Sequence, residues 1–106
     1  KLSLAVALRL RPRACAGAEV FVATSHLFWD PRYPDLKLLQ AFLLAREVER
    51  LAAGSPVVVA GDLNSTPFLE GAPGAMSGAY ELLTQGRVEA SHPHHPAALR
   101  RVRGQD

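Results

Sequence analysis

Three polar side chains of this sequence could together hydrolyse a phosphoester: Asp62, Asn64 and His26. That reaction needs an activated water, a cation that neutralises phosphate charge, and hydrogen-bond donors placed where negative charge develops. Asp62 could orient or deprotonate the water or help to hold a metal, and Asn64 and His26 could donate to phosphate oxygens. The alternative is that Asp62 and Asn64 only begin a turn and that His26 is structural.

The acid and the amide stand at the end of an apolar run. Residues 57–63 are predicted to form a buried strand, because turn formers follow an unbroken apolar stretch of that length. Side chains alternate along a strand, so Asp62 and Asn64 are expected to point the same way.

Two more strands are predicted earlier in the chain, at residues 2–10 and 19–28, with a connection short enough for an antiparallel hairpin. Alternation along the second strand places His26 at its far end, beside the point where the chain leaves the sheet. Two prolines and an aspartate then predict a rigid aromatic loop at residues 29–34.

A helix is predicted at residues 36–53, with Asp35 as its N-cap and Gly54 at its end. Strand, helix and strand form a crossover unit, so the two flanking strands are expected to lie parallel in one sheet. Their ends then share one edge, which brings His26 to the rim that carries Asp62.

The rest of the chain offers less chemistry. A second helix is predicted at residues 78–85, capped by Ser77 and closed by Gly86, and residues 89–106 are expected to be a surface loop or disordered. The basic residues there are interpreted as structural or solvated, because prolines flank the histidines and no supporting acid lies nearby; they are His92, His94, His95, Arg100, Arg101 and Arg103.

The composition indicates a small globular unit of 106 residues. A net charge of +2 permits a polyanionic partner without requiring one. Cys15 is the only cysteine, which excludes an internal disulfide and suits a reducing compartment, so the cytoplasm, and also the nucleus, is expected. Apolar runs are too short to span a membrane. Because the chain starts with Lys1 inside a strand pattern, we expect it to be a fragment.

Four motifs stand in order along the chain: SHLFWDP at 25–31, DLKLLQ at 35–40, AGDLNSTP at 60–67 and SGAYELLTQGRV at 77–88. Together they resemble the carbon catabolite repressor type of deadenylase, in the endonuclease/exonuclease/phosphatase superfamily. The resemblance implies an α/β (α+β) fold, a fragment of the four-layer, DNase I-like sandwich in which two sheets face each other with helices outside. The chain, residues 1–106, would be a partial catalytic domain with its site at the rim between the sheets.

The same resemblance implies a role for each rim residue. Asp62 would help to activate the attacking water near a centre of one or two Mg²⁺ ions, and is itself a candidate ligand. Asn64 would position the scissile phosphate, and His26 would stabilise the charge that develops on it. The family's metal-binding Glu and its late Asp and His match no motif here.

Four further residues are candidates for substrate binding or support. Pro31 would pack against the substrate adenine, and Trp29 beside it offers a surface on which a base could stack. Lys37 and Gln40 fit the family pattern at the helix start and are assigned a supporting role.

The implied function is a part of a magnesium-dependent 3′-5′ exoribonuclease that shortens the poly(A) tails of mRNA. Poly(A) RNA would be its substrate, and a larger deadenylation complex its partner. Two alternatives remain open. One is a related phosphodiesterase acting on 2′,5′-linked oligoadenylate or another nucleotide, and the other is a non-catalytic interaction module.

Because half of the family's catalytic residues match nothing here, we expect the isolated 106-residue chain to bind magnesium weakly and to leave poly(A) intact. Incubation with labelled poly(A) and magnesium measures this. Appreciable shortening that Asp62→Ala abolishes would contradict the expectation.

Overall fold

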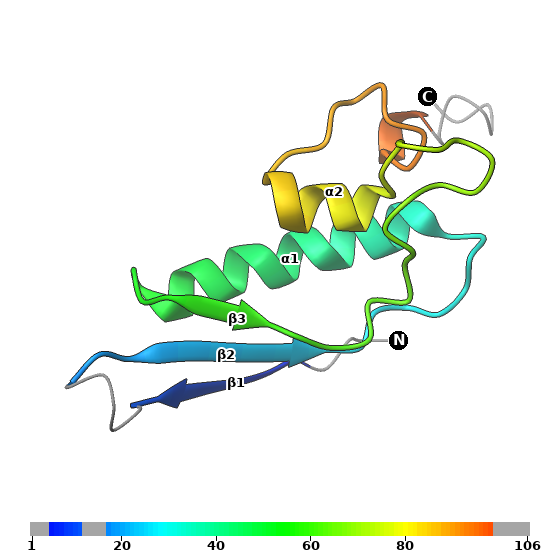
Figure 1. The fold of residues 1–106 in the computed structure, drawn as a ribbon. Coiled ribbons are helices and arrows are strands. Elements are labelled where there is room, and N and C mark those ends of the chain that lie inside the picture. Colours follow the sequence, from blue (N-terminus) through cyan, green and yellow to red (C-terminus); the bar gives the residue numbers. More distant parts are fainter. Residues whose placement is uncertain (1–4, 12–16, 99–106) are drawn as a thin grey trace.

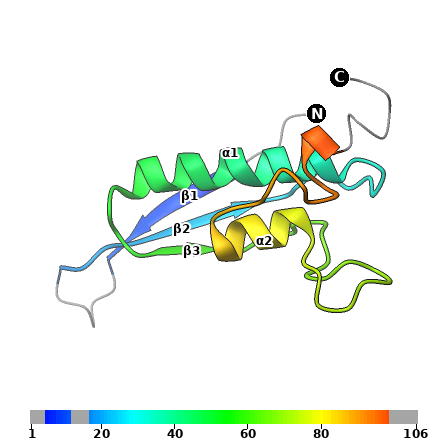
Figure 2. The same ribbon diagram turned by 90° about the horizontal axis from the view of Figure 1, so that it is seen from above.

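The computed structural model describes residues 5–11 and 17–98 (Figure 1). A single sheet in the order β1-β2-β3 carries both helices over one face, and no helix or strand of the described residues covers the other (Figures 1 and 2). The fold is therefore mixed α/β, as predicted. Its elements are β1 Ala5–Leu10, β2 Val20–Ser25, α1 Pro34–Ala52, β3 Val57–Val59 and α2 Gly78–Gln85.

The strand pairing confirms the predicted hairpin and crossover. Strand β1 runs antiparallel to β2, with Leu8 opposite Val22, and β3 runs parallel to β2, with Val58 opposite the same Val22. Helix α1 makes the connection between the parallel strands. The ends of β2 and β3 consequently meet at one edge of the sheet.

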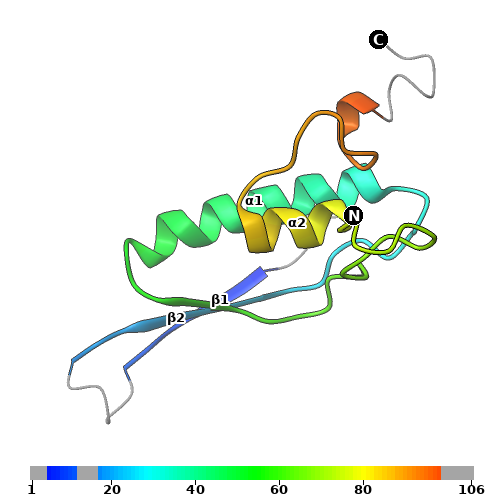
Figure 3. The same cartoon turned by 45° about the horizontal axis from the view of Figure 1, so that its top comes forward.

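Two apolar clusters hold the helices to the sheet. Phe21 and Ala23 alternate onto the helix side of β2 and pack against α1, at Leu44, Val48 and Ala52. Leu27, Ala41 and Ala79 form a second buried cluster where α2 lies beside α1 (Figure 3). Burial of apolar area of this kind is the main stabilising term for both helices.

Helix α1 begins earlier than predicted. Its N-cap is Tyr33, Pro34 follows in the first turn, and no side chain caps the helix, so the prediction of Asp35 as N-cap is wrong. Proline favours the first helical position, because its φ is already helical and it has no N–H to leave unpaired. At the other end Ala53 takes the left-handed conformation, with φ 51°, and Gly54 follows it.

The prediction of a buried strand over residues 57–63 is also wrong. Strand β3 ends at Val59, and its three valines are 38% to 50% exposed. A single sequence shows an apolar run but not its neighbours, and within the described residues β3 pairs only with β2.

Gly61 permits a very close approach of the two chains just beyond β3. A Cβ atom there would lie 2.3 Å from the backbone oxygen of Ser25. One residue later the parallel pairing resumes, with a bridge between His26 and Asp62. The backbone N–H of Leu27 donates to the backbone oxygen of Asp62 at 2.9 Å. Glycine is therefore required where the two chains close on each other.

Helix α2 has the predicted bounds, and Gly86 closes it in the left-handed conformation, with φ 77°. Ser77 is the N-cap by position, but its buried hydroxyl makes no hydrogen bond.

Residues 89–98 form turns followed by a helical segment at residues 96–98, contain no fully buried residue, and pack next to α2. Imidazole-to-backbone hydrogen bonds hold them. Gly78 donates its N–H to Nδ1 of His94 at 3.0 Å, and Nε2 of His92 lies 2.8 Å from the Met76 oxygen. Such bonds leave no periodic sequence signal. The three arginines at positions 100, 101 and 103 lie outside the described residues.

We expect Gly61→Ala to destabilise the protein by about 1–3 kcal/mol, because the added methyl group meets backbone rather than a flexible side chain. The free energy of unfolding, measured by denaturant titration of the complete gene product that contains this chain, reports the change. Gly71→Ala is the control, since nothing lies near its Cβ and only its positive φ is strained. A Gly61→Ala protein as stable as the unchanged one would contradict the packing.

The imidazole of His94 predicts a loss of stability in mild acid. Burial chiefly, then the charges of His92 and Lys37, lower its pKa below the ordinary 6.5. The unfolded chain then binds a proton more readily, so stability is full above about pH 6.5 and falls as the pH drops toward the lowered value. We expect His94→Asn, which can still accept from Gly78, to flatten the unfolding free energy between about pH 7.5 and 5.5. An unchanged slope would refute this role, and His95→Asn is the control.

Candidate active site

His26 and Asp62 meet at the edge where β2 and β3 end. Nε2 of His26 lies 3.5 Å from Oδ2 of Asp62, and the two side chains are 70% and 64% exposed. The crossover geometry predicted from the sequence therefore places an imidazole and a carboxylate side by side, in contact with solvent.

Asn64 is fixed beside this pair by its own hydrogen bonds. Its N–H donates to Oδ1 of Asp62 at 2.9 Å, and its Nδ2 donates to the Leu27 oxygen at 2.7 Å. Its φ of 44° is left-handed, so strand alternation does not relate Asn64 to Asp62. A turn that Asp62 begins holds them together instead. The turn and the candidate site, which the sequence offered as alternatives, are formed by the same residues.

The loop after β2 presents a rigid apolar surface. Asp30 is 3% exposed and accepts hydrogen bonds from the backbone and the guanidinium of Arg32. That guanidinium chiefly holds the pKa of Asp30 below its usual range. Trp29 stays 62% exposed, with the Phe28 ring 6.0 Å away. The buried Asp30 is a positioning residue of this loop that sequence reasoning did not single out.

Lys37 and Gln40 reach the two loops from the first turns of α1. Nζ of Lys37 donates to the backbone oxygen of Asn64 at 2.8 Å. The backbone N–H of Phe28 donates to Oε1 of Gln40 at 2.8 Å. Pro31, Lys37 and Asn64 line one cavity of about 310 Å³. The candidate base-binding residue Pro31 and the candidate phosphate-binding residue Asn64 thus line the same cavity.

The described residues contain no cluster of three or more His, Cys, Asp or Glu side chains that could hold a metal. Asp62 could supply one carboxylate ligand, since Oδ1 is engaged by Asn64 and the side chain is largely exposed. One carboxylate does not make a magnesium site, because the ion takes near-octahedral oxygen coordination. The described residues alone therefore do not fit a complete metal centre.

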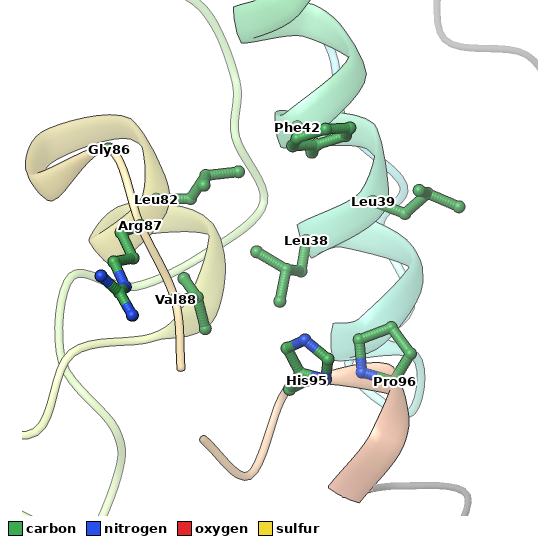
Figure 4. Close-up of a pocket in the computed structure, with 9 residues that line it drawn as sticks. All are labelled: Leu38, Leu39, Phe42, Leu82, Gly86, Arg87, Val88, His95 and Pro96. Carbon is green, nitrogen blue, oxygen red and sulfur yellow. The ribbon is translucent and has the colours of Figure 1, made fainter. Parts of the chain in front are cut away.

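A second cavity, of about 350 Å³, lies in the groove between α1 and α2 (Figure 4). Leu38, Phe42 and Leu82 give it apolar walls. None of the three rim residues lines it, and its polar side chains are Arg87 and His95. None of the helices in the described part of the chain is long and apolar enough to cross a membrane.

Comparison with known proteins assigns the family. Residues 3–103 match the family described as "Endonuclease/Exonuclease/phosphatase family". Members of this family generally use divalent metal ions.

Individual relatives agree with the resemblance to deadenylases. The chain is 32% identical to the "CCR4-Not complex 3'-5'-exoribonuclease subunit Ccr4" of Aspergillus niger over 85% of its length, covering 16% of that protein. It is 32% identical to the protein of the same name from Candida glabrata, over 87% of the chain and 10% of that protein. It is 37% identical to "CCR4-NOT transcription complex subunit 6-like-B" of Xenopus laevis, over 69% of the chain and 14% of that protein.

The chain thus spans between 10% and 16% of the length of these curated relatives. The family match covers nearly all of it, and the mixed α/β sheet with helices on one face agrees with that match. The chain belongs to the endonuclease/exonuclease/phosphatase family.

Proposed function

We propose that this chain supplies the water-orienting and phosphate-binding residues of a 3′-5′ exoribonuclease that shortens the poly(A) tails of mRNA. The observation that carries the proposal is the His26–Asp62 pair, 3.5 Å apart, beside the fixed amide of Asn64. Similarity to proteins named as 3′-5′ exoribonuclease subunits supports the choice of reaction.

Asp62 orients the attacking water in this mechanism. Oδ1 accepts the Asn64 N–H, which orients the carboxylate, and Oδ2 lies beside Nε2 of His26 at the exposed rim. A water held at Oδ2 donates a proton to this oxygen as its own oxygen approaches phosphorus. General-base assistance of this kind contributes about 10²–10⁴-fold to a rate.

Asn64 and His26 bind the phosphate. Nδ2 of Asn64 has two hydrogens, and its bond to the Leu27 oxygen uses one, so the second remains for a non-bridging phosphate oxygen. The exposed His26 imidazole, beside Asp62, is the second group proposed to bind the phosphate. Donors fixed before the reaction stabilise the developing charge without reorganising.

The loop after β2 binds the base. The exposed face of Trp29 provides a stacking surface, and Pro31 lies at the cavity that it shares with Asn64. An adenine packed against Pro31 would place its own phosphate within reach of the Asn64 amide.

Magnesium is the proposed metal, and Asp62 the one described residue assigned to it. The ion would neutralise phosphate charge and lower the pKa of the attacking water. The remaining ligands would come from outside the described residues, which is why the isolated chain is expected to be inactive.

The proposed partner is a larger deadenylation complex, in the cytoplasm and also in the nucleus. The relatives named above are described as subunits of the CCR4-Not complex, which supports an assembly of that kind.

In the complete gene product that contains this chain, we expect Asp62→Asn to lower the rate of poly(A) shortening by about 100-fold or more, since the amide accepts a proton poorly.

We expect Asn64→Ala to lower the rate of poly(A) shortening by about 100- to 1000-fold, the usual cost of removing one fixed donor. Gel analysis of end-labelled oligoadenylate with magnesium measures both rates.

Glu49→Gln is the matched control, because Glu49 is an exposed acid of α1. Full activity in Asp62→Asn would refute the mechanism. A gene product that cleaves 2′,5′-linked oligoadenylate but not poly(A) would instead assign the related phosphodiesterase function.

A further inference from the structure

Asn64 is bound through three different polar groups. Its backbone N–H donates to Oδ1 of Asp62, and its side-chain Nδ2 donates to the backbone oxygen of Leu27. Its backbone carbonyl oxygen accepts from Nζ of Lys37. Its φ of 44° costs free energy for any residue with a Cβ, although asparagine tolerates it better than most. The conformation of Asn64 is therefore maintained by these bonds rather than by local backbone preference.

Of these three bonds, the one from Lys37 comes from a helix, α1. The Lys37 side chain crosses from α1 to the turn after β3, and the residue is only 7% exposed. A buried ammonium must be compensated, and the carboxylate of Asp30 is close enough for Lys37 to add to the effect of Arg32 in lowering the pKa of Asp30. The hydrogen bond from the ammonium to the Asn64 backbone carbonyl is charge-assisted, and such bonds are stronger than those between neutral groups.

Gln40, one turn further along the same helix, is hydrogen-bonded to the loop after β2. It stands three residues after Lys37, so the two side chains leave α1 on the same side. Its Oε1 accepts from the N–H of Phe28, which directly follows the Leu27 that accepts from Asn64. The start of α1 thus bonds both loops, and Asn64 bonds the loops to each other.

We propose that Lys37 is a positioning residue of the active site, which acts through Asn64 by holding its carbonyl so that the side-chain amide faces the scissile phosphate. Gln40 holds the loop after β2 by accepting the Phe28 N–H. The proposal rests on the proposed function, because it assigns Lys37 to the phosphate-binding step of that site. Reactions of this kind are sensitive to displacements of about 1 Å, so the loss of one anchoring bond is measurable.

The test is a double-mutant cycle in the complete gene product with labelled oligoadenylate and magnesium. We expect Lys37→Met, which keeps the apolar stem, to lower kcat by about 10- to 100-fold with little change in KM. In the Asn64→Ala background we expect Lys37→Met to have no further effect, because no amide remains to be positioned. Arg46→Met is the matched control, since it removes an exposed cation from the same helix.

A second measurement follows the amide itself. Exchange of the Asn64 Nδ2 hydrogens with solvent, observed by NMR on the same protein, is expected to speed up in Lys37→Met and to stay unchanged in Arg46→Met. If Lys37→Met does not fold, Lys37→Gln, which keeps a donor at shorter reach, takes its place and should show a smaller effect in the same direction.

The outcomes separate the two proposals. Equal losses from Lys37→Met with and without the Asn64 amide, or unchanged exchange of that amide, would overturn the positioning role and leave the proposed function standing. Full activity of Asn64→Ala alone would overturn the phosphate-binding role of Asn64, and with it the proposed mechanism.

Discussion

The candidate site depends on one backbone hydrogen bond beyond the ends of β2 and β3, where the Leu27 N–H donates to the Asp62 backbone oxygen at 2.9 Å. This bond continues the parallel pairing of β2 and β3 after the ladder has ended, and Gly61 makes the approach possible because it has no Cβ. The pairing sets His26 opposite Asp62. The Leu27 carbonyl then accepts the Asn64 side chain, so one short stretch of backbone orders all three rim residues.

The elements that the sequence predicted well are those fixed by long apolar periodicity and by chain connectivity. Helix α1 and the presence and direction of β2 and β3 follow from their patterns, and a crossover between parallel strands admits one arrangement of their ends. That rule was sufficient to bring His26 to Asp62 from positions 36 residues apart in the sequence. The sequence could predict that His26 and Asp62 lie side by side because this follows from the strand connectivity, which several apolar patterns along the chain indicate together.

The features that the sequence did not predict depend on neighbours or on single hydrogen bonds. The exposure of β3 depends on what lies beside it, and the start of α1 depends on whether Pro34 or Asp35 sets the first turn. The order of residues 89–98 comes from imidazoles such as His94, which bond backbone groups far along the chain. Close inspection of Gly61 between an apolar strand and an acid could have indicated the close approach, since glycine in such a place often marks one.

Because side chains alternate along β2, the residues that pack against α1 and the candidate site residue His26 lie on opposite faces of the sheet. Phe21 and Ala23 turn toward α1, so Val22 turns to the opposite face, and the same alternation carried on to His26 places that imidazole on the face without helices. Cross-strand partners share a face, so the exposed Leu8 and Val58 flank Val22 there. Within the described residues no helix or strand covers this face, so its apolar side chains are exposed. Helix α1 therefore bonds both loops of the candidate site from the covered side of the sheet, while the imidazole of His26 lies on the open side.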